Sequence, residues 1–130
     1  MANTTPIFTL TPVITAEVIS TANTNRNGTG TIVNLITGSE NGTRIHKITI
    51  NALGSTTAGA VRLFINTGTN VRMLKEIMVS AITPSSTVSV WTYTWTLFGE
   101  QAIILPQNYI LGCSTNNAES FSVIVEGGSY

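Results

Sequence analysis

The sequence predicts an all-β protein: a single-domain antiparallel β-sandwich of jelly-roll-like topology, with about eight or nine strands and little helix. Short stretches of alternating apolar residues recur at regular spacing, and clusters of Gly, Asn, Ser and Pro separate them. No segment keeps the 3.6-residue period of an amphipathic helix. At 130 residues the chain has the size of one domain and can bury a core without disulfides or metals. We expect an extended N-terminal arm at residues 1–12 and the sandwich at residues 13–130.

The clearest hairpin runs from residue 58 to residue 79 and turns near Gly68. Residues 61–66 alternate between two sets of side chains, which is the period of a β-strand with one face toward a core. In the second half of the hairpin, the apolar positions change phase near Lys75-Glu76. This change predicts either a β-bulge at that point or a strand that is buried on both faces.

The other strands are each bounded by turn residues. They are expected at residues 13–20, 31–37, 43–52, 87–97, 102–105, 109–114 and 120–126. Asn-Gly pairs at positions 27–28 and 41–42 predict tight turns, because both residue types tolerate positive φ. Together with the central hairpin, these stretches supply the strands of a two-layered fold.

A polar loop, TANTNRNGTG, occupies residues 21–30. In it Asn23, Asn25 and Asn27 surround Arg26. Asn and Gly are the residues that turns require whatever their function, so the loop is either a binding loop or a turn that its own Asn side chains stabilise.

The N-terminal arm is uncharged and contains Pro6 and Pro12. Ile7, Phe8 and Leu10 form an apolar patch within it. Such an arm either docks on its own sandwich or reaches a neighbouring subunit, and both alternatives remain open at this stage.

Three aromatic residues, Trp91, Tyr93 and Trp95, alternate along one predicted strand and share one face of it. Exposed aromatic rings at this spacing are suited to binding sugars. The neighbouring Val and Thr residues alternate with them at strand period, which favours a role in the core or in a subunit interface.

The chain carries very little charge. Only 9% of its residues are charged and the net charge is zero, whereas an average protein has about 25% charged residues. A freely diffusing monomer usually keeps its net charge away from zero, so this composition suggests a surface that lies against other subunits. Six basic residues balanced by six Glu give no basic field, which argues against nucleic-acid binding. No apolar run approaches the ~18 residues of a membrane span.

The sequence contains no recognisable catalytic set. It has no aspartate and a single histidine, His46, so a Ser-His-Asp triad cannot form. Cys113 is the only cysteine and lies in no known nucleophile motif. The Glu residues are scattered singly, and one His with one Cys cannot build a zinc site. We therefore expect no catalytic residues, no metal site, no cofactor and no enzymatic activity.

Three segments resemble small structural proteins of tailed bacteriophages, several of which are capsid decoration (cement) proteins. The segments are TANTNRNGTG, AGAVRLFINTGTNVR and TNNAESFSVIVEGGSY. The resemblance implies a compact β-sandwich that assembles as a homotrimer and binds the major capsid protein. It further implies that the protein is made in the host cytoplasm and located in the virion, on the outer capsid surface, where it ties capsomers together.

These expectations assign hypothetical roles to two sets of residues. The expected capsid contacts are Ile7, Phe8, Leu10, Asn23, Asn25, Arg26 and Asn27. The expected subunit-interface residues are Arg62, Arg72, Glu76, Trp91, Tyr93 and Trp95, with the three charged residues paired at a seam. The alternative function is a carbohydrate- or receptor-binding module of a phage tail or head fibre, for which the aromatic residues and Asn-rich loops would form the binding surface.

Overall fold

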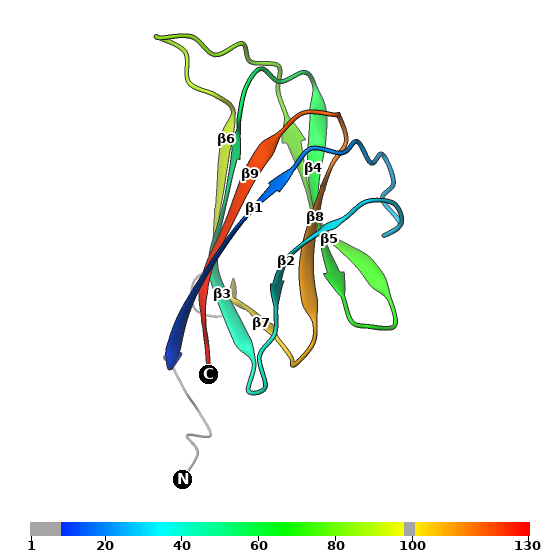
Figure 1. Ribbon diagram of the computed structural model, residues 1–130, viewed down its shortest axis with the longest axis vertical. Helices are drawn as coiled ribbons and strands as arrows, with labels where there is room; N and C mark the ends of the chain where they lie inside the picture. The colour runs from blue at the N-terminus through cyan, green and yellow to red at the C-terminus, as the bar shows by residue number, and fades with distance from the viewer. Residues whose placement is uncertain (1–8, 98–100) are drawn as a thin grey trace.

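The computed structural model describes residues 9–97 and 101–130, which form nine β-strands in two sheets packed face to face (Figure 1). The first sheet has the order β1 (Thr11–Ile19), β9 (Phe121–Ser129), β3 (Thr43–Ala52) and β6 (Thr92–Thr96), with β7 (Ile103–Leu105) beside the other end of β3. The second sheet has the order β2 (Val33–Thr37), β8 (Ile110–Thr115), β4 (Gly59–Asn66) and β5 (Val71–Val79). The pairings within both sheets are antiparallel, which confirms the predicted β-sandwich.

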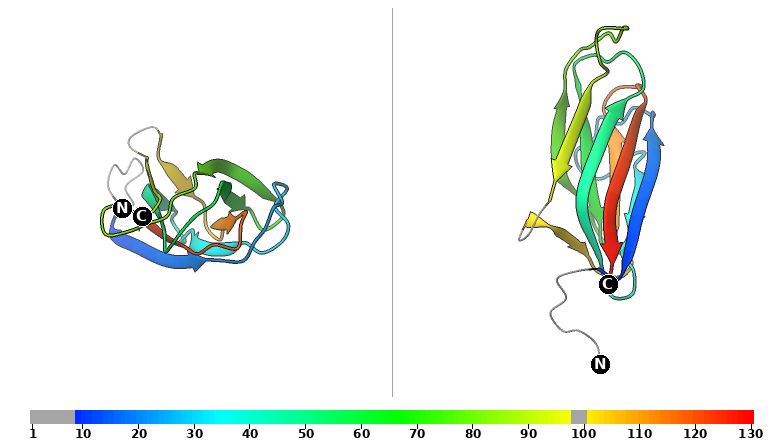
Figure 2. Two further views of the ribbon diagram at one scale, coloured as in Figure 1. Left: turned by 90° about the horizontal axis from the view of Figure 1, so that it is seen from above. Right: turned by 90° about the vertical axis from the view of Figure 1, so that its left-hand side faces the viewer.

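The strand order is that of a jelly roll. Along the chain β1 pairs with β9, β2 with β8, β3 with β6 and β7, and β4 with β5. The chain is thus one long antiparallel ribbon whose tip is the β4–β5 turn, rolled so that successive pairs fall in alternate sheets (Figure 2). Rolling the ribbon places β9 between β1 and β3 in the first sheet.

The core lies between the two sheets and is built by alternate residues of the inner strands. The following side chains have no measurable exposure: Ile48, Ile50, Val61, Leu63, Leu111, Cys113, Val123 and Val125. They are β-branched or branched apolar residues for the most part, which pack well on a pleated surface. Each large apolar side chain buried here contributes roughly 1.5–3 kcal/mol.

Strand β4 is buried on both faces. Val61 and Leu63 face the core, while Arg62 and Phe64, on the opposite face, are each only 1% exposed. The opposite face is covered by residues 20–32, hereafter the covering loop, which connects β1 to β2. Sequence periodicity alone does not predict this cover, because a polar loop carries no apolar pattern.

The irregularity predicted near Lys75-Glu76 is a β-bulge. Leu63 pairs with Lys75 and Phe64 pairs with Met73, so Leu74 has no partner on β4. The extra residue explains the change of phase, since it moves the later side chains to the other face. The alternative, burial on both faces, does not describe β5 in this structure, because Met78 is 68% exposed.

Several predicted boundaries are wrong; the last strand, for example, runs to Ser129 and not only to residue 126. Strand β1 begins at Thr11, so the last two residues of the predicted arm belong to the sheet, and the amide of Leu10 donates to the carbonyl of Ser129 at 2.9 Å. The strand predicted at 87–97 is shorter, and β6 begins at Thr92. The amide of Ser85 donates to the carbonyl of Val88, and Ser85 Oγ accepts a hydrogen bond from the amide of Thr87. These local hydrogen bonds hold residues 85–88 in a turn, because they compete with sheet pairing.

Candidate functional site

A charge cluster lies between strand β4 and the covering loop. Arg62 Nε is 2.7 Å from Glu76 Oε2, and the Arg62 side chain is only 2% exposed. Its two Nη atoms donate to the carbonyl of Asn23 and to Asn116 Oδ1, both at 3.1 Å. Arg26, from the covering loop, donates to the same Glu76 oxygen at 2.7 Å. A single buried guanidinium therefore ties β4, β5 and two loops together.

The carboxylate of Glu76 is held in its ionised form. Hydrogen bonds from Arg62 and then from Arg26 lower the pKa of Glu76 below its ordinary value of 4.5, and they outweigh the burial that would raise it. Arg72, predicted to lie at the same seam, takes no part in the cluster. Its guanidinium contacts the carbonyl of Val71 at 3.0 Å and Asn70 Oδ1 at 3.4 Å, because the bulge at Leu74 places it on the other side of β5.

A lowered pKa makes the contribution of Glu76 dependent on pH. Above about 4.5 the carboxylate stabilises the fold fully, and this contribution is lost as the pH falls through the lower pKa of the folded state. We expect Glu76→Gln to reduce stability at pH 7 and to have a smaller effect at acid pH. Urea unfolding at both pH values measures the difference. Glu40→Gln, in an exposed turn, is the control, and an equal pH dependence in both variants would contradict the prediction.

The covering loop is stabilised by its own asparagine side chains. Asn23 is 5% exposed, and its amide donates to the carbonyls of Thr29 at 2.9 Å and Thr31 at 3.0 Å. Its Oδ1 accepts from the amide of Asn25 at 3.0 Å, and Asn27 Oδ1 accepts from Thr29. The turn interpretation of this loop is therefore confirmed. The side chain of Asn23 is committed within the loop, so of the four predicted contact residues in it only Asn25, Arg26 and Asn27 are exposed.

Two glycines allow close contacts of the covering loop, Gly28 with the second sheet and Gly30 within the loop itself. Gly28 and Gly30 both have positive φ, +89° and +85°. A Cβ on Gly28 would lie 2.5 Å from the carbonyl oxygen of Val71, and a Cβ on Gly30 would lie 2.7 Å from the side-chain oxygen Oδ1 of Asn23. Only glycine fits these positions, because any other residue would be strained at positive φ and its Cβ would clash with the neighbouring atoms.

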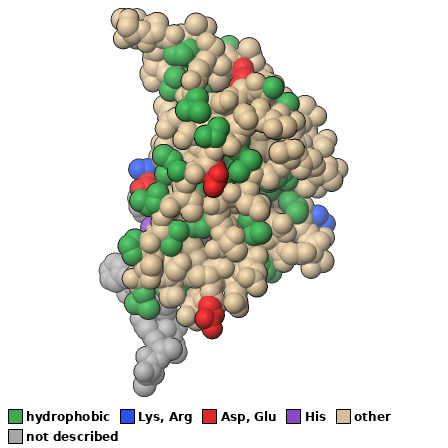
Figure 3. Space-filling model, in the orientation of Figure 1, with side chains coloured by type: hydrophobic (Ala, Val, Ile, Leu, Met, Phe, Trp, Pro, Cys, Tyr) green, Lys and Arg blue, Asp and Glu red, His purple; other side chains and the backbone are tan. Residues whose placement is uncertain are grey.

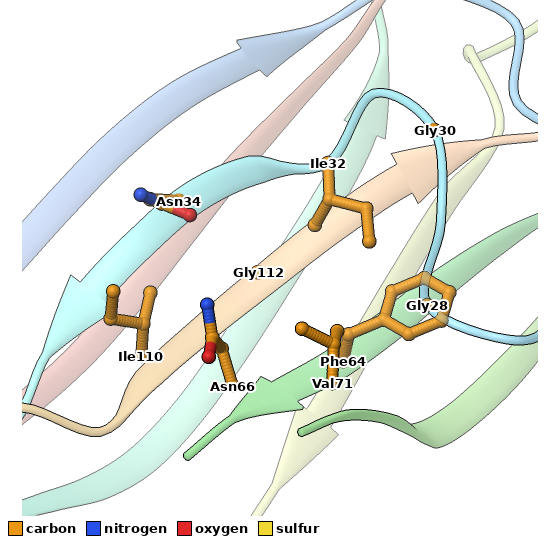
Figure 4. A pocket seen from close by; sticks show the side chains of 9 residues that line it. All are labelled: Gly28, Gly30, Ile32, Asn34, Phe64, Asn66, Val71, Ile110 and Gly112. Carbon is orange, nitrogen blue, oxygen red and sulfur yellow. The ribbon is translucent and has the colours of Figure 1, made fainter. Parts of the chain in front are cut away.

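A shallow pocket of about 200 Å³ lies where the covering loop meets the second sheet (Figure 4). Its lining residues carry no charge: Gly28, Gly30, Ile32, Asn34, Phe64, Asn66, Val71, Ile110 and Gly112. One of its two amide side chains, Asn66, already accepts a hydrogen bond from the amide of Gly68 at 2.8 Å. The lining contains no acid, base or nucleophile, so it offers shape and two amides but no catalytic chemistry.

The predicted aromatic row lies on the inner side of the first sheet. Trp91 is 7% exposed and stacks on Tyr93 with ring centroids 6.4 Å apart, and it meets Phe121 edge to face at 5.7 Å. Tyr93 and Trp95 are half-buried against the core. Lys75, from β5, lies 4.8 Å from the centroid of the Trp95 ring and closes the edge between the sheets. The rings are therefore core residues, and their faces do not form an open platform for a sugar.

The Cys-His pair that the sequence formally allows lacks a nucleophile. Cys113 lies on β8 in the second sheet, and burial raises its pKa to about 12, so the thiol stays protonated at neutral pH. His46 lies on β3, in the first sheet. The described residues contain no group of three or more His, Cys, Asp or Glu side chains that could hold a metal ion.

An exposed apolar stripe runs along the edge strand β1. Leu10 is 84% exposed, Ile14 68% and Val18 54%, and the exposed Pro12 and Ala16 lie between them. These five residues, hereafter the β1 stripe, alternate with the residues that face inward. Figure 3 shows hydrophobic side chains spaced along this part of the surface. Of the predicted arm contacts, Leu10 belongs to the stripe, while Ile7 and Phe8 lie outside the described residues.

Sequence reasoning missed the stripe, although the signal was present. The even-numbered residues from Leu10 to Val18 are apolar without exception, which is the alternation of one strand face. The boundary placed at residue 12 divided this pattern between an arm and a strand. Asn116, a partner of Arg62, and Phe64, which lies beside Gly28 of the covering loop, were also missed, and no local pattern identifies them.

Within residues 9–97 and 101–130, no helix has the length and hydropathy needed to cross a bilayer. Neither a comparison with models of protein families nor a search of curated proteins finds a match for this chain.

Proposed function

We propose that this chain is a capsid decoration protein of a tailed bacteriophage, which binds the major capsid protein on the outer head surface and bridges neighbouring capsomers. The observation that carries the proposal is the β1 stripe, an exposed apolar strip on a protein with almost no charge. Such a surface favours permanent contact with other subunits over free diffusion.

The energetics of this role require only modest contacts. Each apolar contact contributes roughly 25 cal/mol per Å² buried, and association subtracts a large entropic term from the sum. An oligomer that touches several capsid subunits gains by effective concentration, so weak single contacts add up to stable attachment. The homotrimer implied by the resemblance is one assembly that would supply this gain.

The fold is compatible with the role by analogy only. Jelly rolls occur in viral capsid proteins and in lectins, so the topology by itself fits both decoration and glycan binding. The aromatic row, on which the glycan-binding alternative depended, is packed against the core. This position favours decoration over a carbohydrate- or receptor-binding module. Glycan or receptor binding stays a prediction for the Asn-rich loops alone.

Binding to purified heads tests the proposal. Phage heads stripped of this protein should bind it in a co-sedimentation assay, and Leu10→Asp should weaken binding at least about tenfold, equivalent to about 1.4 kcal/mol. Val88→Asp, at a 46% exposed position in a distant loop, is the matched control. Localisation in whole virions provides the second measurement. Density over the head supports decoration, whereas density at the tail tip alone, or no binding to heads, would overturn it.

A further inference from the structure

In the described part of the chain the sandwich has four open edges, and three of them carry features that oppose pairing with another strand. On one side β6 and β7 have only five and three residues. Strand β2 has five residues and a shift of register between Asn34 and Ile36. Strand β5 is bulged at Leu74 and carries Arg72, Lys75 and Glu76. Short strands, bulges and charges are the usual protection against edge-to-edge association.

Strand β1 differs from the other edges among the described residues. It has nine residues, and all nine pair with β9 in one unbroken register from Thr11 to Ile19. Its single charged residue is Glu17. Its outer face presents the β1 stripe, and its open side offers backbone donors and acceptors to a further strand. Pro12, near one end, and Glu17 are its two protective features.

We propose that β1 pairs antiparallel with β1 of a second copy of this chain, about a two-fold axis through Ala16. The contact continues the first sheet from one copy into the other. It is isologous, because the same nine-residue segment, 12–20, supplies both sides. At about 3.4 Å per residue the paired segment spans about 30 Å.

The register about Ala16 is chosen by the side chains. It places Ile14 opposite Val18 of the second copy, and Ala16 opposite its own equivalent, on the face that carries the β1 stripe. On the other face Glu17 lies opposite Thr15, so the carboxylate meets neither a second carboxylate nor an apolar side chain. An axis through Glu17 would oppose two carboxylates, and an axis through Thr15 would set Glu17 against Val13. Of these three registers, only the Ala16 register avoids both conflicts.

The same register limits the effect of proline. Pro12 lies opposite Ser20 at the end of the paired segment, so the missing amide removes at most one terminal hydrogen bond. Ile124 lies beside Ala16 on β9 and is half-buried, so the outer apolar face of β1 extends at this point onto β9. Self-pairing also covers the open edge of both molecules. A strand from another protein would cover the edge of only one molecule.

Substitution at a matched pair of positions tests the contact. Ile14 and Met78 are both 68% exposed on edge strands, one in each sheet. Wild-type protein should have twice the 13.8 kDa chain mass in light scattering at micromolar concentration. Ile14→Lys should give a monomer, or weaken dimerisation at least about tenfold, while Met78→Lys should remain dimeric. Far-ultraviolet circular dichroism checks that both variants are folded.

Cysteine crosslinking tests the register without relying on a disruptive variant. The native Cys113 has no exposure and does not react. Ala16→Cys should give a covalent dimer on oxidation or with a short bismaleimide. Ile14→Cys and Val18→Cys should crosslink efficiently with each other when mixed, and poorly when alone, because four residues separate like positions along the strand.

A wild-type monomer would overturn the proposal, as would a trimer that Ile14→Lys leaves intact. The Ala16 register would be overturned if Ile14→Cys alone, or Val18→Cys alone, crosslinked as strongly as the mixture of the two variants. If wild type is monomeric but Ile14→Lys loses binding to heads, the edge takes a strand of the capsid protein and self-pairing is wrong. These measurements use purified protein, so the proposal goes beyond the decoration role and its failure would leave that role standing.

Discussion

Replacing Arg62 with alanine is expected to lower the free energy of unfolding by about 3–5 kcal/mol, the usual effect of breaking a buried ion pair from one side. The loss leaves Glu76, the carbonyl of Asn23 and Asn116 Oδ1 without the guanidinium that they share. Urea unfolding followed by tryptophan fluorescence measures the change. The covering loop should also lose protection from hydrogen exchange, since Arg62 holds both the carbonyl of Asn23 and the Glu76 carboxylate that Arg26 contacts.

Arg72→Ala is the matched control for this experiment. Arg72 is exposed and contacts only residues beside it in sequence, so its removal should change stability by less than about 0.5 kcal/mol. Equal effects of the two substitutions would show that the charge cluster does not stabilise the fold. A combined Arg62→Met and Glu76→Leu variant refines the test, because well-packed apolar residues often replace a buried ion pair without loss.

The second large effect is expected from Phe64→Ala, at about 3–5 kcal/mol. Phe64 is 1% exposed on the outer face of β4, and it lines the small pocket next to Gly28 (Figure 4). Truncation would join the volume of its ring to that pocket, so water would reach the underside of the covering loop. Thermal unfolding measures the loss.

Phe64→Leu keeps most of the side-chain volume and should cost less than about 1.5 kcal/mol. Val88→Ala, in an exposed loop, controls for the loss of apolar surface alone. A loss from Phe64→Ala as small as that of Val88→Ala would mean that the covering loop does not seal this face.

The parts of the fold that the sequence predicts correctly are those governed by local rules. The β4–β5 hairpin and its turn follow from alternation and from Gly68, whose φ of +90° matches the expectation for glycine. The bulge was visible as a change of phase, because one extra residue in a strand reverses the side-chain pattern that follows it. Both signals lie within a few residues of the feature that they predict.

The parts that could not be predicted depend on contacts between distant segments. Arg26 and Glu76 were each singled out, but 50 residues separate them, and only the folded covering loop brings them together. The burial of Phe64 on an outer face has the same cause. Alternation identifies two faces of a strand, and it gives no information on whether a loop from elsewhere in the chain covers the second.

The position of β9 between β1 and β3 has a consequence for how the chain acquires its structure. Neither β1 nor β3 can complete its hydrogen bonds in the first sheet until residues 121–129 are available. Topologies that depend on such distant pairings fold slowly, because loop closure precedes any favourable contact. During synthesis, strand β1 therefore waits for a partner that lies about 100 residues further along the chain. Throughout that interval its apolar residues are open to premature association.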